Sequence, residues 1–452
     1  MERNAIKKHL PALLLLVLCV ALVAIGMSTL LGGRVSEVFS DVDYGLDGGS
    51  VGSSVPGADR GPVIHDTGRD EPITPGGATR RPEGQPAALK AGEINDNEAF
   101  SEYLTYLDNY HSPMSVHLVD VQERYIISVL NDQQQPLYDT SVRVYRGQRQ
   151  LFAGQTYANG QILFLPGLYG IDVDTRDEKD ERYFRVVAER GDSSVETTID
   201  RQRRQQLVEL TLEGAKPPAE LQLDMLFLLD TTGSMGDELG RIQATIDSIA
   251  QRINGFEPRP SIRYGLVAYR DHGSDEAYVT LTYDFIDDLA TFQKLLNGLD
   301  ANGGGDTPEA LNEALNQAVE HVSWSDDAVR LIFLVADAGP HIDEPVVQTN
   351  ANDQYSGEGY IGEARKAIAQ GVKIYAIAAS NTDTMAEYVF RQLAQQTMGS
   401  FIFLTYQSGA SGGAPGEYRD DIEAGQQQYT VERLDDLIVQ VVERELAQAS
   451  GL

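Results

Sequence analysis

The second half of the chain alternates short, continuous apolar runs with stretches in which apolar residues recur at helical spacing. Continuous apolar strands that alternate with amphipathic helices indicate a mostly parallel sheet covered by helices on both faces. We therefore expect a doubly wound, Rossmann-like α/β domain over residues 219–450. The predicted strands are 221–229, 262–269, 277–283, 330–336, 372–379 and 401–405, and the predicted helices are 236–254, 287–299, 307–322, 360–370, 384–397 and 432–448.

Residues 96–214 have a different pattern, in which six or seven short strands are separated by turn residues. Strands at this spacing predict an antiparallel β-sandwich. Asn159 and Gly160 form a turn signal directly before an apolar strand. This Thr-x-x-Asn-Gly turn resembles the carboxypeptidase-regulatory-like, prealbumin-type sandwich modules, and an immunoglobulin-like sandwich of another lineage stays open. The segment carries no catalytic constellation, so we interpret it as a spacer or a secondary binding surface.

The N-terminal region predicts a membrane anchor followed by a linker. Residues 10–31 are apolar or small throughout, which is long enough for a helix to span a bilayer. Basic residues precede this run, so residues 1–32 are expected to hold the N-terminus in the cytoplasm and the remaining chain outside the inner membrane, periplasmic or extracellular. Signal cleavage after Gly26 is the alternative. Residues 33–95 are rich in Gly, Pro, Ser and Asp and predict a disordered linker.

The net charge indicates which classes of partner the chain can bind, and the cysteine content indicates its cellular compartment. The chain has 36 Lys and Arg against 68 Asp and Glu, a formal net charge of -32. Such an excess repels phosphate backbones, so we expect no nucleic-acid partner, whereas cation binding or basic partners remain compatible. The one cysteine, Cys19, lies in the apolar N-terminal run, so the folded part has no disulfide, which favours a bacterial envelope.

Oxygen-bearing side chains follow three segments of the predicted parallel sheet. Ligands of such sheets bind at the carboxyl ends of the strands, where these segments meet. Helix capping or a tight turn explains each segment taken alone, but all three in this order predict a metal site. The residues are Asp230, Thr232 and Ser234 after one strand, Thr307 after a glycine-rich run, and Asp337 after another strand.

Because of these five side chains, the segment 221–450 resembles a von Willebrand factor A domain. The resemblance implies a metal-ion-dependent adhesion site with all five side chains as ligands, in which Thr232 replaces the usual first Ser and keeps its hydroxyl. It implies a divalent cation, Mg²⁺ first, with Mn²⁺ or Ca²⁺ as alternatives. An Asp or Glu of a protein partner would complete the metal shell. The stretches "GLVAYRDHG" and "FLVADAGPH" resemble a bacterial subset of the family.

Several residues near the predicted metal site have both a functional and a purely structural interpretation. Asp306 is either a water-mediated ligand or a partner of backbone amides at a helix start. His272 and His341 lack a short metal-ligand spacing, so we interpret them as loop residues that could in principle bind a transition metal. Candidate contacts at the rim of the site, or members of a solvated loop, are Arg270, Asp271 and Asp275.

The sequence lacks three motifs that are typical of enzyme active sites. No phosphate-binding Gly-Lys-Ser/Thr ending, Gly-x-Ser-x-Gly elbow or His-Glu-x-x-His helix occurs. We therefore predict a membrane-tethered, extracytoplasmic binding module that is not an enzyme and has no small-molecule substrate. The alternatives are an envelope scaffold, an assembly or chaperone-accessory protein and, less favoured, a metal-dependent hydrolase.

Overall fold

The computed structural model describes most of the chain after residue 87. The described residues are 88–110, 116–177, 181–257, 259–273, 276–305, 307–342, 357–407, 415 and 429–451. The predicted anchor 1–32, most of the predicted linker, Asp275 and Asp306 lie outside them. None of the described helices is both long and apolar enough to span a bilayer.

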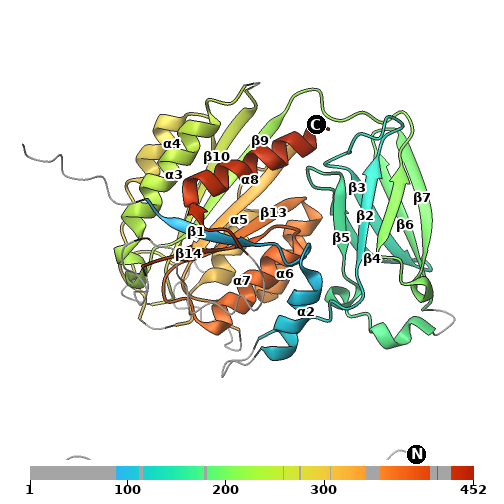
Figure 1. Cartoon of the computed structure of the whole chain (residues 1–452), viewed down its shortest axis with the longest axis horizontal. Coiled ribbons are helices and arrows are strands. Elements are labelled where there is room, and N and C mark those ends of the chain that lie inside the picture. Colours follow the sequence, from blue (N-terminus) through green and yellow to red (C-terminus); the bar gives the residue numbers. More distant parts are fainter. Residues whose placement is uncertain are drawn as a thin grey trace, which may run out of the picture. The chain divides into compact units, whose positions relative to one another are not determined.

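An eight-stranded sheet forms the framework of the second half (Figure 1). Its strands follow the order β11-β10-β9-β12-β13-β14-β1-β15, and the five adjacent strands β10, β9, β12, β13 and β14 are parallel. Each predicted strand is present, so the expected large and mostly parallel sheet is confirmed. The bounds are β9 Gln222–Asp230, β10 Ser261–Tyr269, β11 Thr280–Ile286, β12 Ala328–Ala336, β13 Val372–Ala378 and β14 Phe401–Thr405.

Helices cover both faces of this sheet, as the alternating pattern predicts. One face packs against α3, Leu239–Ile253, α4, Leu289–Leu296, and α8, Leu434–Ala449. The other face packs against α5, Leu311–Glu320, α6, Gly359–Ala369, and α7, Thr384–Gln396.

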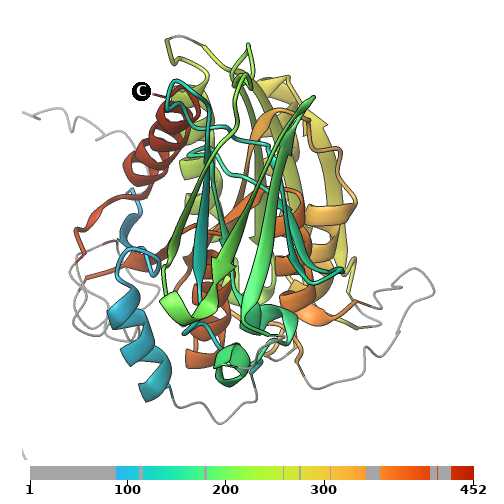
Figure 2. The ribbon, with the colours of Figure 1, turned by 90° about the vertical axis from the view of Figure 1, so that its right-hand side faces the viewer.

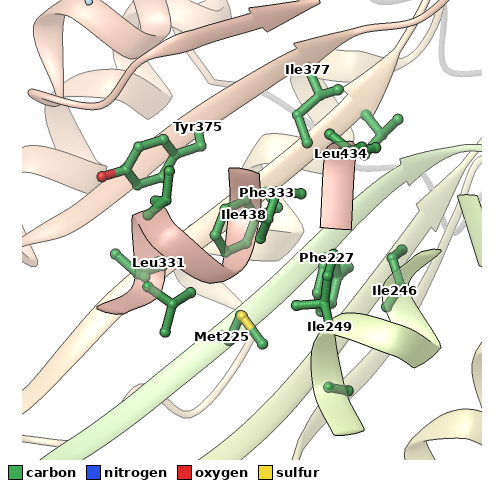
Figure 3. Packing of buried hydrophobic residues seen from close by; sticks show 14 of the residues in the cluster. Met225, Phe227, Ile246, Ile249, Leu331, Phe333, Tyr375, Ile377, Leu434 and Ile438 are labelled. Atoms are coloured by element: carbon green, nitrogen blue, oxygen red, sulfur yellow. The ribbon is translucent and has the colours of Figure 1, made fainter. Parts of the chain in front are cut away.

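Figure 3 shows the first of these layers, in which Phe227 of the central strand stacks on Phe333 with the ring centroids 5.7 Å apart. Side chains of α3 and α8 close over this pair, and both phenylalanines are fully buried. Because the strands under the two helical layers are apolar on both sides, the polar strand ends are left at the edge of the sheet.

The sheet gains two strands that the sequence pattern did not indicate. β1, Lys90–Ile94, runs antiparallel to β14, with Lys90 opposite Thr405 and Ile94 opposite Phe401. β15, Glu432–Arg433, pairs with the outer side of β1. The prediction of a linker up to residue 95 is therefore wrong for its last residues, because Ala91 and Ile94 are buried in the sheet.

Residues 125–211 form two further sheets, of three and four strands, drawn from teal to green in Figures 1 and 2. Both sheets contribute to one hydrophobic cluster, as in a sandwich. All their pairs are antiparallel except β2 with β8. The fully antiparallel prediction fails there because the chain crosses from β7 to the other sheet and reaches β2 running in the same direction. The strands are β2 Tyr125–Leu130, β3 Ser141–Arg146, β4 Arg149–Gln155, β5 Gln161–Phe164, β6 Tyr183–Arg190, β7 Ser193–Asp200 and β8 Leu207–Thr211.

The turn at Asn159 and Gly160 has the conformation that its sequence predicts. Gly160 has a φ of 72°, and its N–H donates to the carbonyl of Tyr157 at 2.8 Å. A Cβ at this position would lie 2.6 Å from the carbonyl oxygen of Val129, so only glycine fits the close approach. Short 3₁₀ helices complete the fold at Pro166–Tyr169, Val173–Asp177, Arg201–Arg203 and Gly233–Asp237.

A helix missed by the sequence analysis, α2, Phe100–Asn109, follows β1 and packs against α7. Asp96, just before it, forms a two-pronged ion pair with Arg391 of α7, with N–O distances of 2.9 and 2.6 Å. Both side chains are almost completely buried, and the guanidinium lies 3.8 Å from the ring centroid of Tyr106. This cluster ties the segment before the two smaller sheets to the helical layer of the large sheet.

Candidate metal centre

Asp230 ends the central strand β9 and is completely buried. Its Oδ1 accepts hydrogen bonds from the backbone N–H of Thr232 at 2.8 Å and from the Thr232 hydroxyl at 2.7 Å. The Thr232 Oγ1 lies 3.0 Å from the hydroxyl of Ser234. This Asx-type turn ends the strand and gathers three oxygen-bearing side chains at one point.

Asp337 directly follows β12, which pairs in parallel with β9, so the two strand ends lie side by side. Its carboxylate accepts a hydrogen bond from Ser234, and its charge contributes to a raised pKa of Asp230. Four of the five predicted ligands are therefore brought together.

Thr307 is placed differently from the other four. The loop before it packs on the Asp230 turn, because the N–H of Gly233 donates to the carbonyl of Gly303 at 2.9 Å. Gly304 has a φ of 67°, and a Cβ there would lie 2.9 Å from the Cβ of Thr232. The Thr307 side chain is exposed and makes no hydrogen bond to the other four predicted ligands, all of which are described. Its role as a ligand stays a prediction.

The electrostatics of this site suit a divalent cation. Burial raises the pKa of Asp230 to about 7, and the neighbouring charge of Asp337 adds to the rise. Burial likewise raises the pKa of Asp337. Within the described residues, Oδ2 of Asp230 and Oδ1 of Asp337 are buried and make no hydrogen bond of regular geometry. The Tyr269 hydroxyl is a further neighbour that favours the charged form of Asp230. Buried, unpaired carboxylate oxygens beside two hydroxyls are a costly arrangement without a cation and the kind of ligand set that Mg²⁺ prefers.

Glu309 is an acidic neighbour of the site that the sequence analysis missed. Its pKa is raised to about 9, first by burial and then by the charges of Asp230, Asp271 and Asp337. Its backbone N–H donates to the carbonyl of Gly339 at 2.9 Å, which joins the glycine-rich loop to the loop after β12. The residue stands two positions after Thr307 in a run otherwise typical of a helix start, so its sequence position alone did not reveal its burial.

We expect the Mg²⁺ affinity to rise about tenfold per pH unit below pH 7 and to level off above it. The raised pKa means that the metal-free protein holds a proton on Asp230, which the cation must displace. For the same reason, the Asp230 carboxyl contributes to the free energy of unfolding of the metal-free protein. This contribution is complete below about pH 4 and is lost as the pH rises through about 7. Calorimetric titration between pH 5 and 8 measures the affinity, and thermal melting in EDTA measures the loss. An affinity independent of pH over this range would contradict the expectation.

The two loop histidines His272 and His341 lie together beside this site. His341 Nε2 is 2.8 Å from Oδ1 of Asp271, and His272 Nε2 is 2.9 Å from Oε1 of Glu313. The two imidazole ring centroids are 5.1 Å apart. Both histidines lie in loops, as expected, and the structure brings them close to each other and to Asp271.

Arg270 does not form the rim contact that its position suggested. Only 4% of the residue is exposed, because it packs inward between neighbouring loops. Its guanidinium donates to the carbonyl of Asp300 at 3.0 Å and lies 4.5 Å from the ring centroid of Tyr278. It is a structural residue that fastens the loop after β10.

The von Willebrand factor A domain family matches residues 224–406 of the chain. Human von Willebrand factor A domain-containing protein 7 is 34% identical over 114 residues, which cover 25% of this chain and 12% of that protein. Mouse hemicentin-2 is 36% identical over 103 residues, 23% of this chain and 2% of that protein. The chain thus spans a small fraction of the length of these relatives.

Among solved structures, proximal thread matrix protein 1 from the mussel byssus, with a zinc-occupied MIDAS motif, is similar to this chain. The TM-score is 0.30 at 15% identity, and the overlap covers 40% of this chain and 44% of the mussel protein.

Proposed function

We propose that the von Willebrand factor A domain of this chain binds a protein partner through a divalent cation, Mg²⁺ first. The observation that carries the proposal is the pair of buried, unpartnered carboxylate oxygens on Asp230 and Asp337, beside the hydroxyls of Thr232 and Ser234. These four side chains would hold the cation, with Thr307 on the covering loop as the fifth. When bound, the cation supplies an electrophilic centre that an Asp or Glu of the partner can ligate.

The ligand set supports binding in preference to catalysis. Only two of the five residues carry a charge, so the cation keeps enough positive charge to attract one further carboxylate. The hydroxyls complete the shell without neutralising it. The net charge of -32 repels acidic partners in general, so a partner's carboxylate would be drawn to the cation and not to the surrounding surface. An enzymatic role is not part of the proposal.

The proposal also places the domain outside the cytoplasm. The basic and then apolar N-terminal residues would anchor the chain in the inner membrane, and the following polar segment would give the folded part reach. The two smaller sheets would act as a spacer or second binding surface, in keeping with their resemblance to the carboxypeptidase-regulatory-like modules. A scaffold or assembly role would use the same location without the cation.

Cation-dependent capture of a partner tests this function. The purified full chain is immobilised and exposed to envelope extract in Mg²⁺, and the bound proteins are then eluted with EDTA. We expect one predominant partner to elute and to bind again when Mg²⁺ is restored, because its carboxylate requires the cation. A partner that stays bound in EDTA would favour the scaffold alternative, and no captured partner in Mg²⁺ would speak against the proposal.

A further inference from the structure

We propose that Asp271, His272 and His341 form a second cation site, suited to a transition metal such as Zn²⁺, with Glu313 orienting His272. One ligand atom from each of the three residues lies within 4.8 Å of the others. The inference is independent of the proposed function, because it uses none of the side chains assigned to the first site.

The backbone holds the three segments of this site in place. Asp271 and His272 follow the end of β10, His341 lies in the loop after β12, and Glu313 lies in the first turn of α5. The N–H of Ala310 donates to the carbonyl of Arg270 at 3.1 Å, and the side-chain amide of Asn312 donates to the carbonyl of His341 at 2.6 Å. Neither bond involves a metal-binding atom of the three residues, so both bonds fix the backbone around the ligands independently of an ion.

Two distances between ligand atoms lie on either side of the value for a tetrahedral site. Bonds of about 2.05 Å from zinc to nitrogen and oxygen place neighbouring ligand atoms about 3.4 Å apart. Oδ1 of Asp271 lies 3.8 Å from Nδ1 of His272 and 2.8 Å from Nε2 of His341. Side-chain shifts of under about 1 Å would open the closer pair and admit the ion between the three atoms.

Glu313 supplies the orientation that metal-binding histidines need. Its Oε1 is 2.9 Å from Nε2 of His272, a contact that fixes the ring with Nδ1 3.8 Å from Oδ1 of Asp271. The Glu313 side chain is 8% exposed, and its Oε2 is buried without a partner among the described residues. A carboxylate behind a histidine ligand raises the basicity of the ligand and fixes its ring.

The charge balance also favours a cation over a plain hydrogen-bond network. In the described part of the chain, the ion-pair partners of Asp271 and Glu313 are these two histidines alone. Both carboxylates are more than nine-tenths buried, so their charge is poorly screened by water. Two imidazoles and a carboxylate select Zn²⁺ and similar ions, whereas the all-oxygen set at Asp230 selects Mg²⁺. Three protein ligands leave a fourth position to water or a partner's side chain.

Co²⁺, which replaces Zn²⁺ and absorbs visible light strongly only in tetrahedral sites, tests this inference in the full chain. The first site is kept filled by excess Mg²⁺ in one series and removed by Asp230→Ala in a second. We expect one equivalent of tetrahedral Co²⁺ in both series, displaced by Zn²⁺. His272→Ala and His341→Ala should each abolish that spectrum, and His321→Ala, which changes an exposed histidine of α5's end, should retain it.

Two further variants decide between a metal site and a structural role. Glu313→Gln should keep the spectrum and weaken Zn²⁺ binding about 10- to 100-fold, because it acts through His272. A folded His272→Ala/His341→Ala variant that binds Zn²⁺ as tightly as the parent in excess Mg²⁺ would overturn the proposal, as would parent protein that shows no tetrahedral spectrum. Mg²⁺ binding by this double variant should equal that of the parent, so failure of one site is separable from failure of the other.

Discussion

Replacing Asp230 with alanine should lower the Mg²⁺ affinity of the full chain by more than about a hundredfold. Loss of a residue that only supports a ligand already costs about 10- to 100-fold, and Asp230, itself completely buried, contributes one of the two carboxylates of the site. The remaining Asp337 and hydroxyls would carry too little negative charge to replace the hydration shell of the ion. Isothermal calorimetry measures the affinity directly. Mg²⁺ should also raise the melting temperature of the wild type and leave that of the variant unchanged.

Asp237→Ala is the matched control for this experiment. Asp237 is exposed and ends the short helix Gly233–Asp237. Its substitution removes the same charge as Asp230→Ala without removing a predicted ligand. The control should bind Mg²⁺ within about twofold of the wild type, since a single exposed charge is largely screened. Equal binding by the wild type and a folded Asp230→Ala variant would refute the metal site.

Replacing Arg391 with methionine should reduce the free energy of unfolding by about 3–5 kcal/mol. The substitution leaves the carboxylate of Asp96 buried without its two hydrogen bonds from the guanidinium. Glu387, one turn earlier on α7 and equally buried, loses an ion-pair partner at the same time. Because Arg391 lies on α7 and its ion-pair partners Asp96 and Glu387 are not predicted metal ligands, Mg²⁺ affinity should be unaffected wherever the variant is folded.

Urea unfolding of the full chain measures this loss. Arg203→Met serves as the control, because Arg203 is 76% exposed and lies 3.7 Å from its partner Asp200. An exposed pair of this kind contributes less than about 1 kcal/mol. If Arg391→Met cost no more than the control, the buried cluster between α2 and α7 would not be a source of stability.

The strands and helices of the large sheet were predictable because their signals are local. A run such as 331–336 is apolar throughout, and such a run can satisfy its backbone only inside a sheet covered on both faces. β1 has no comparable signal: its five residues, "KAGEI", include two charges and a glycine. It forms a strand because it pairs with the edge of β14, which lies far away in the sequence. Helix α2 likewise begins without a side-chain cap at Ala99.

The same distinction holds for the two candidate sites. Asp230, Thr232 and Ser234 form a local turn, so their spacing alone predicted their convergence. His272 and His341 are separated by 68 intervening residues and meet only because β10 and β12 both flank β9. The rule that carboxyl ends of parallel strands share one edge of a sheet indicates this pair, whereas the spacing of the two histidines in the sequence does not.

The position of β1 between β14 and β15 has a consequence for the order in which the chain can fold. β1 is among the first described residues to be synthesised, whereas its two partner strands come about 300 residues later. During synthesis, the backbone groups of Lys90–Ile94 must therefore wait with both edges open, an arrangement that invites pairing with other chains. Closure of the sheet occurs only after the last strand has been made. A nascent chain interrupted before Phe401 would consequently retain β1 with both of its edges unpaired.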